Sequence, residues 1–294
     1  RQTHYSLMKP KYFLPNIAGR TALLASLIIV GFAAPSAQAL VLKGSDTAGT
    51  SSFTSPLTGA AAGWVTTVGT GTGVAPVSGT NYFTGAFNLR TPANATSVTF
   101  PGDSLSVDTG GRFIFKNTGA STITVNNLIL NGASTEIAIS NGDTLSVTLA
   151  GNITVNAAST LSALGAPANN SGNFETLNIT ATINNTGSAG LTISGTPNAG
   201  TNTGVVKLSA ANTYAGTVTV ATPTNGFVAS ATNRLLQLNN LNALQNATLN
   251  LTSVANGVSF AASANTGVFN IGALSGSSNQ ALADTANTDA PHKG

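Results

Sequence analysis

The chain has 294 residues, of which 41% are hydrophobic and only 6% are charged. Because a typical soluble domain has about 25% charged residues, water must here meet mainly hydroxyl, amide and backbone groups. The hydrophobic content argues against a disordered chain, and the lack of cysteine excludes disulfides, cysteine metal sites and cysteine nucleophiles.

The basic character of the chain belongs to its N-terminus. The sequence pI is about 9.4, but four basic residues lie within residues 1–39, which contain no acidic residue. The remaining residues hold seven basic and eight acidic side chains, a net charge of −1. We therefore expect no nucleic-acid partner, since a phosphate-binding surface requires clustered positive charge.

Residues 1–39 have the layout of a secretory signal peptide. A positively charged start at residues 8–11 precedes an apolar run at residues 21–34 and the small residues Ala37 and Ala39. A membrane anchor is the alternative, but the run is shorter than the about 18–20 residues of a spanning helix and a proline follows it. We predict cleavage directly after Ala39, with the first residues of the chain upstream of the signal, and a protein that is secreted or displayed on the cell surface.

Residues 40–95 differ in composition from the rest of the chain. They contain the single tryptophan and a group of aromatic residues: Trp64, Tyr82, Phe83 and Phe87. This segment is predicted to be a β-rich N-terminal cap, which a stack of coils needs, or a small separate β-module. The run Gly69–Gly73 lacks the lysine and following helix of a phosphate-binding loop, so we interpret it as a turn.

Residues 96–280 consist of short apolar clusters in which hydrophobic and polar residues alternate, the pattern of half-buried strands. Examples are Leu105–Val107, Ile123–Val125, Ile137–Ile139, Leu145–Leu149, Leu177–Ile179, Val218–Val220 and Val258–Phe260. The segment Leu235–Leu244 fits either one or two helical turns or a turn at Asn239–Asn240 between strands.

Internal echoes indicate a repeated unit. Residues 101–107 recur in altered form at 141–147, and residues 123–126 recur at 153–156. Such self-similarity is typical of a solenoid, whose coils bury their apolar faces only by stacking. We predict an all-β parallel β-helix with coils of roughly 20–25 residues, about eight of them between residues 96 and 280. Pairs of asparagines, such as Asn126–Asn127 and Asn184–Asn185, suit the corners.

A motif near the C-terminal end resembles a known family. Asn212, Thr213, Tyr214, Gly216 and Thr217 lie between two strand-like clusters, and the arrangement is similar to the autotransporter-associated β-strand repeat of bacterial exported proteins. The resemblance covers about residues 186–278 and implies a right-handed parallel β-helix of the passenger type, on a Gram-negative outer surface. It implies a structural role for the five motif residues. The polar tail, 281–294, is predicted to be a truncated coil of a longer passenger.

Catalysis is the main alternative. Both histidines, His4 and His292, lie outside the predicted folded body, so no histidine base is available there for a catalytic triad. Asp103 and Asp143 occupy equivalent places in the echoed motif and could form a carboxylate pair, with basic residues at 112 and 116 nearby. Each aspartate instead suits a turn, where its carboxylate binds backbone amides. The same carboxylates could bind calcium, but no Asp-x-Asp spacing occurs, and no metal or cofactor is predicted.

The sequence thus predicts a non-enzymatic, exported structural or adhesive surface protein that presents an extended polar face. The expected partners are glycans, matrix or other copies of the chain, with membrane contact only during export or through a missing C-terminal segment. The alternative is a carbohydrate-active β-helix enzyme of the polysaccharide lyase or glycoside hydrolase kind.

Overall fold

The computed structural model describes residues 38–47, 49–54, 62–94, 96–139, 146–163, 175–194, 204–221, 235–252, 254–261 and 267–280. These residues form twenty β-strands and no helix, and within them no helical segment is suited to crossing a membrane. The predicted signal peptide up to Ala37, the residue Asp143 and the tail 281–294 lie outside the described residues.

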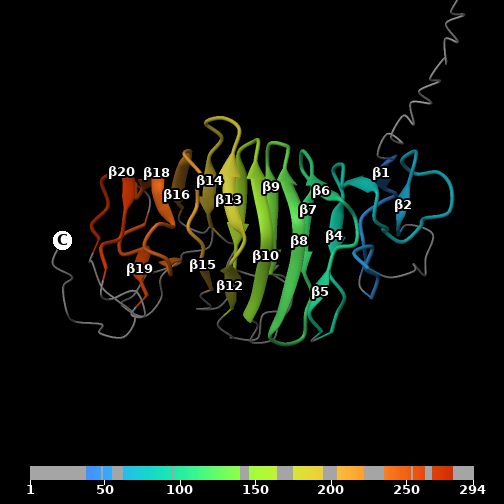
Figure 1. Ribbon diagram of the computed structural model, residues 1–294, viewed down its shortest axis with the longest axis horizontal. Helices are drawn as coiled ribbons and strands as arrows, with labels where there is room; N and C mark the ends of the chain where they lie inside the picture. The colour runs from blue at the N-terminus through green and yellow to red at the C-terminus, as the bar shows by residue number, and fades with distance from the viewer. Residues whose placement is uncertain are drawn as a thin grey trace, which may run out of the picture. The chain divides into compact units, whose positions relative to one another are not determined.

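Most strands belong to a larger sheet (Figure 1). In order of pairing it contains β19 (Val258–Phe260), β17 (Leu236–Leu238), β15 (Val205–Leu208), β12 (Thr176–Ile179), β10 (Ser146–Val155), β8 (Ser121–Leu130), β6 (Ser104–Val107), β3 (Thr80–Phe83), β1 (Gln38–Leu42) and β2 (Trp64–Val65). The larger sheet has two more strands, which pair with its two longest strands: β13 (Thr182–Asn185) pairs with β10, and β5 (Val98–Thr99) pairs with β8.

The smaller sheet has eight strands. In order of pairing they are β20 (Ile271–Ser275), β18 (Leu244–Asn250), β16 (Thr217–Val220), β14 (Leu191–Ile193), β11 (Ser159–Ser162), β9 (Thr135–Ile139), β7 (Arg112–Phe115) and β4 (Asn88–Arg90). From β3 onward the chain passes between the two sheets, and the strands pair in parallel from one coil to the next. The described body is therefore a parallel β-solenoid, as the sequence predicts.

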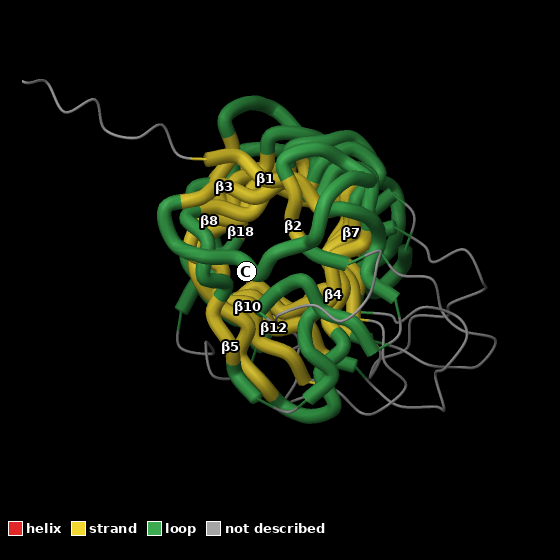
Figure 2. The backbone as a smooth tube through the Cα atoms, turned by 90° about the vertical axis from the view of Figure 1, so that its right-hand side faces the viewer, coloured by secondary structure: helices red, strands yellow, loops and turns green. Residues whose placement is uncertain are grey.

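The two longest strands each turn a corner. The first half of β10 pairs with β12 and its second half pairs with β13, while β8 divides in the same way between β5 and β6. In β8 the corner falls at the exposed pair Asn126–Asn127, as the sequence predicts. In β10 it falls at Gly151, whose φ is +108° and where a Cβ atom would lie 2.0 Å from the Val125 carbonyl oxygen. Seen along the stack, the strands surround a central space that side chains fill (Figure 2).

Columns of apolar side chains fill this interior. One column in the larger sheet keeps a single register through six coils: Ile123, Leu149, Ile179, Leu208, Leu238 and Phe260. All six are at most 8% exposed. Since full burial of such a side chain contributes about 1.5–3 kcal/mol, the columns are the main source of stability.

The coils are longer than predicted. Paired residues are 22 positions apart between Leu236 and Val258 but 32 apart between Leu161 and Ile193. As a result, seven strands of the smaller sheet fall within residues 96–280 instead of the eight predicted coils. Strand periodicity sets the length of a rung but not the length of the connection between rungs, which explains the error.

The ambiguous segment Leu235–Leu244 contains no helix. β17 ends at Leu238 and β18 begins at Leu244, with a turn between them in which Asn240 accepts hydrogen bonds from the amides of Asn242 and Ala243. The interpretation as a turn between strands is confirmed, and the helical alternative is wrong.

The described parts of residues 40–95 share one hydrophobic core with the coils. The Trp64 ring lies 4.8 Å from Tyr82, and Phe53 lies 5.2 Å from Phe100 and 5.5 Å from Phe113, measured between ring centroids. β1 pairs in parallel with β3, whereas β2 runs antiparallel along the other side of β1. The pairing of β1 with β3 places Ala39, the predicted last residue of the signal peptide, opposite Asn81.

Candidate functional site: the motif corner, the two ends and the outward face

Asn212 of the predicted motif is a buried bridge between coils. Its side chain is 2% exposed and lies in the connection between β15 and β16. The Oδ1 atom accepts from the Ile183 amide at 2.8 Å, and Nδ2 donates to the Ala243 carbonyl at 3.0 Å. One amide group thus satisfies backbone atoms of the coil before and the coil after, which neither a carboxylate nor an aliphatic side chain could do.

Tyr214 closes the same corner from inside. Its hydroxyl donates to the Ala189 carbonyl at 2.6 Å and also lies 3.2 Å from the Thr217 carbonyl oxygen. Burial raises the pKa of Tyr214 to about 12, because the ionised phenolate would lose its hydration. The residue therefore stays neutral at physiological pH and serves as a hydrogen-bond donor.

The other motif residues complete this packing. At Gly216 a Cβ atom would lie 2.3 Å from both the Ala189 oxygen and the Tyr214 hydroxyl, so only glycine fits. Thr213 is exposed, and its amide donates to Ile183, while Thr217 begins β16. The arrangement is a structural corner whose polar groups are used within the protein.

Side-chain ladders join the coils on the outside. Asn131 donates to Asp108 at 3.4 Å, Asn156 donates to Asn131 at 3.3 Å, and Thr186 donates to Asn156 at 2.9 Å. Each step crosses one coil, 23, 25 and 30 residues apart in the sequence. Such ladders replace the ion pairs that a chain with few charges lacks.

Asp103, the carboxylate considered in the catalytic alternative, binds backbone at a turn, as the sequence predicts. Asp103 Oδ1 accepts from the Gly79 amide at 2.7 Å, and the Asp103 carbonyl accepts from the Asn127 side chain at 2.8 Å. Its proposed partner, Asp143, lies outside the described residues, so the structure does not show whether the two carboxylates meet.

The neighbouring charged residues are divided between two environments. Arg112 forms an ion pair with Glu136 of the next coil, with Nε and Oε2 2.7 Å apart. The pKa of Lys116 is lowered, mainly because the side chain is partly buried and secondly because the positive charge of Arg90 lies near it. Across the described ranges no three His, Cys, Asp or Glu side chains gather in a group that could hold a metal ion.

Asp46 has a role that no sequence pattern indicates. This carboxylate is 3% exposed and accepts from the amides of Ser52 and Arg90 at 2.9 and 3.0 Å and from the Ser52 hydroxyl at 2.5 Å. Desolvation raises its pKa, although these hydrogen bonds and the Arg90 charge oppose the effect. A lone aspartate carries no local signal of burial, because its partners are up to 44 residues away.

Asp46 belongs to a set of groups that cap the last strand of the smaller sheet, β4. The outward-facing amides of β4 donate to Ser45 and Asp46, and its outward-facing carbonyls accept from Asp46 and Ser51. The N-terminal edge of this sheet is therefore fully hydrogen-bonded, which prevents another strand from pairing there.

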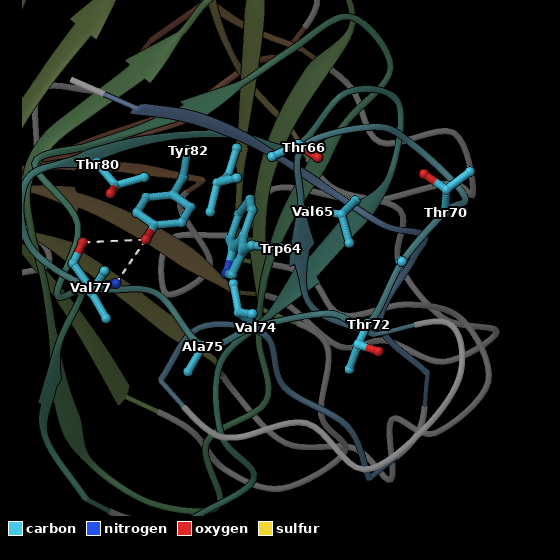
Figure 3. A pocket seen from close by; sticks show the side chains of 12 residues that line it. Trp64, Val65, Thr66, Thr70, Thr72, Val74, Ala75, Val77, Thr80 and Tyr82 are labelled. Atoms are coloured by element: carbon cyan, nitrogen blue, oxygen red, sulfur yellow. Dashed lines mark hydrogen bonds between the residues drawn. The ribbon is translucent and has the colours of Figure 1, made fainter. Parts of the chain in front are cut away.

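A pocket of about 430 Å³ lies beside the aromatic cluster. Its lining includes the fully buried Trp64 and Tyr82 and the threonines at 66, 70 and 72 (Figure 3). The polar atoms of both rings are engaged inside the protein, since the indole donates to Ser52 at 2.7 Å and the phenol accepts from the Val77 amide at 2.8 Å. The lining holds no charged side chain, so the pocket offers only weak polar contacts to a ligand.

The outward side of the smaller sheet carries one continuous column of polar residues. In register from coil to coil it reads Asn88, Arg112, Glu136, Thr160, Thr192, Thr219, Asn250 and Ser275. The described coils beyond Glu136 extend this column with neutral hydroxyl and amide groups about 4.8 Å apart, the spacing of neighbouring strands. Thr217 and Thr248 form a second, parallel row beside it.

Comparison of the chain with models of known protein families, with curated proteins and with solved structures finds no match in any of the three. A proposal on function therefore rests on the fold and on the geometry of these sites.

Proposed function

We propose that this protein is an exported structural or adhesive surface protein of the autotransporter-passenger type. The observation that carries the proposal is the column Thr160, Thr192, Thr219, Asn250 and Ser275, which lines up neutral donors and acceptors at the strand spacing. A face of this kind suits a partner that also repeats hydroxyl or amide groups, such as a polysaccharide or a fibrous matrix protein. Many weak contacts add up along such a face without any single catalytic residue.

The family assignment is part of the proposal. It is supported by the fit between motif and geometry, since Asn212 bridges two coils, Tyr214 donates to the Ala189 carbonyl, and Gly216 lies where a Cβ atom would clash.

Export is likewise a proposal, supported by the signal-peptide pattern. Cleavage after Ala39 would leave Leu40–Leu42 in β1, so the pairings of Val41 with Val65 and of Leu42 with Trp64 would survive. N-terminal sequencing of the exported protein tests this directly: the expected first residue is Leu40, and an uncleaved leader would contradict the prediction.

The binding role is tested on the outward column. A glycan array and immobilised matrix proteins are probed with the wild type and with the double variant Thr192→Ala/Thr219→Ala, which should bind its partner at least tenfold more weakly. The matched control is Thr122→Ala/Thr148→Ala, two threonines in register on the larger sheet, which should leave binding unchanged. Equal loss in both variants, or a wild type that binds nothing on either surface, would contradict the assignment of the face.

The carbohydrate-active alternative predicts a different result in the same assay. An enzyme would release shortened glycans from the array, and the release would stop in Asp103→Asn. Binding without product is the outcome that our proposal expects.

A further inference from the structure

The peptide bond at which we predict cleavage of the leader lies inside a strand of the folded body. β1 begins at Gln38, so the bond between Ala39 and Leu40 has strand residues on both sides. Residues 38–41 pair in parallel with Thr80–Phe83 of β3, without a break at the predicted cleavage point. The bond therefore lies within a continuous run of strand pairings and not in a loop that precedes the body.

The residues that follow this bond are held on their other side as well. Val41 and Leu42 pair antiparallel with β2. Leu40 is 6% exposed and Leu42 is fully buried, whereas the side chain of Ala39 is exposed. The residue before the bond is thus accessible, but the strand that carries the bond cannot leave the sheet without uncovering two leucines of the core.

A peptidase needs what the fold already uses. An extended peptide is recognised through its backbone hydrogen-bonding groups and its alternate side chains. In the folded protein the β3 side of β1 is paired, and the side chains of Leu40 and Leu42 belong to the hydrophobic core. Cleavage of such a bond proceeds through an opened form of the protein, so its rate depends on how rarely β1 detaches.

We propose that the leader is removed only before β1 pairs with β3, and that a chain which folds uncleaved is resistant to the peptidase. This inference rests on the proposed export of the protein and adds the order of two events. Hydrolysis comes first: the bond between Ala39 and Leu40 breaks, and one water molecule supplies the new carboxylate of Ala39 and the new amino group of Leu40. Pairing of the shortened β1 with β3 follows.

An order-of-addition experiment with the full chain tests the proposal. The chain is unfolded in urea and diluted into buffer, and a purified bacterial signal peptidase is added either at once or after the fluorescence of Trp64, the single tryptophan, has become constant. Early addition should give protein that begins at Leu40. Late addition should cleave at least about a hundredfold more slowly, because the bond is then closed within the sheet. Equal cleavage at both times would overturn the proposal.

A synthetic peptide of residues 25–45 is the matched unfolded substrate. It should be cleaved after Ala39 at the same rate whenever the peptidase is added. A peptide that is not cleaved would contradict the predicted signal peptide, and this proposal with it. If the peptide is cleaved and the folded chain is cleaved equally fast, the proposal fails while the signal peptide stands.

Two variants test whether release of β1 is the step that exposes the bond. Trp64→Ala removes the buried ring paired with Leu42 and should make the folded chain at least tenfold more susceptible to the peptidase. The control is Leu249→Ala, which removes a leucine of β18 that is 2% exposed and should leave the chain resistant. Equal susceptibility of the two variants would overturn the role of β1.

Discussion

The two ends of the described solenoid differ in how their outer edges are bonded. At the N-terminal end, Ser45, Asp46 and Ser51 hydrogen-bond the outer edge of β4, β2 runs antiparallel to β1, and Trp64 is fully buried. At the C-terminal end of the described residues, no described strand pairs with the outer side of β20, and Leu274 is exposed. The N-terminal end shows that stacking alone does not close a solenoid, because its first coil needs side chains that hydrogen-bond the outer edge.

The interior coils do not need side chains that cap a sheet edge. Their corners are held by contacts from one coil to the next, of which Asn212 is the most connected, joining Ile183 and Ala243. Each coil contacts only its neighbours, so damage to a corner should weaken nearby coils first. Because the effects are local, hydrogen exchange can distinguish the effects of mutations at the two ends.

The largest effect is expected at the N-terminal aromatic cluster. Trp64→Ala removes a fully buried ring that contacts Tyr82 and Phe100, and should cost about 4 kcal/mol of local stability. Amides of β1 and β3 should exchange faster, whereas those of β16 and β18 should change little. Uniform loss of protection along the whole chain would show that the two ends are coupled.

Asn212→Ala should cost about 3 kcal/mol, because it leaves a buried amide and a buried carbonyl without partners. The matched control is Asn239→Ala, whose half-buried side chain donates to the Ser209 hydroxyl at 3.1 Å. Asn239→Ala should cost less than about 1 kcal/mol of stability, because it leaves Asn212 in place and so keeps the hydrogen bonds to Ile183 and Ala243. Exchange rates in β14, β16 and β18 report the difference, and equal costs would refute the bridging role.

Asp46 tests the edge cap. Asp46→Ala should cost about 2 kcal/mol, because the amides of Ser52 and Arg90 lose their acceptor. Asp46→Asn keeps one oxygen for these amides and should be as stable as the wild type at neutral pH or slightly more stable.

The pH dependence of that pair follows from the raised pKa of Asp46. An acid whose pKa is higher in the folded state contributes stability that is fully present below its unfolded pKa and is lost as the pH rises through the folded value. The advantage of Asp46→Asn in urea unfolding should therefore shrink as the pH falls through the raised folded pKa toward 3.8, and it should not change further below that value. An advantage that grows in acid would contradict the burial argument.

The smallest effect concerns Tyr214 at alkaline pH. Its folded pKa of about 12 exceeds the ordinary tyrosine value of 10.0, so its contribution is complete below pH 10 and declines as the pH rises toward 12. At pH 11 the loss should be on the order of 1 kcal/mol relative to Tyr214→Phe, in which this group cannot ionise. A stability difference between the two proteins that does not change from pH 8 to pH 11 would show that the hydroxyl is not buried as described.

Some sites were predictable because their signals are local. Asparagine pairs mark some corners: Asn126–Asn127 lies at the corner of β8 and Asn239–Asn240 lies in the turn after β17, as expected, whereas Asn184–Asn185 lies within β13. The motif singled out Gly216 and Tyr214, but only the fold shows why these residues are needed. The Ala189 carbonyl leaves no room for a Cβ atom at position 216, and it accepts a hydrogen bond from the Tyr214 hydroxyl.

Other features could not be predicted at all. Asp46 and Arg90 are far apart in the sequence, and the exposure of Leu274 depends on what does not pair with β20. The signal cleavage after Ala39 remains a prediction, and the pairing of Asp103 with Asp143 remains an untested alternative, because Asp143 lies outside the described residues.

The alternation of apolar with polar residues is enough to establish that this chain forms strands with one buried face, because a period of two is a property of the extended backbone. The stacking of those strands, the variable length of the coils and the capping of the β4 edge emerge only in the folded chain, since each depends on contacts between residues 22 to 44 positions apart.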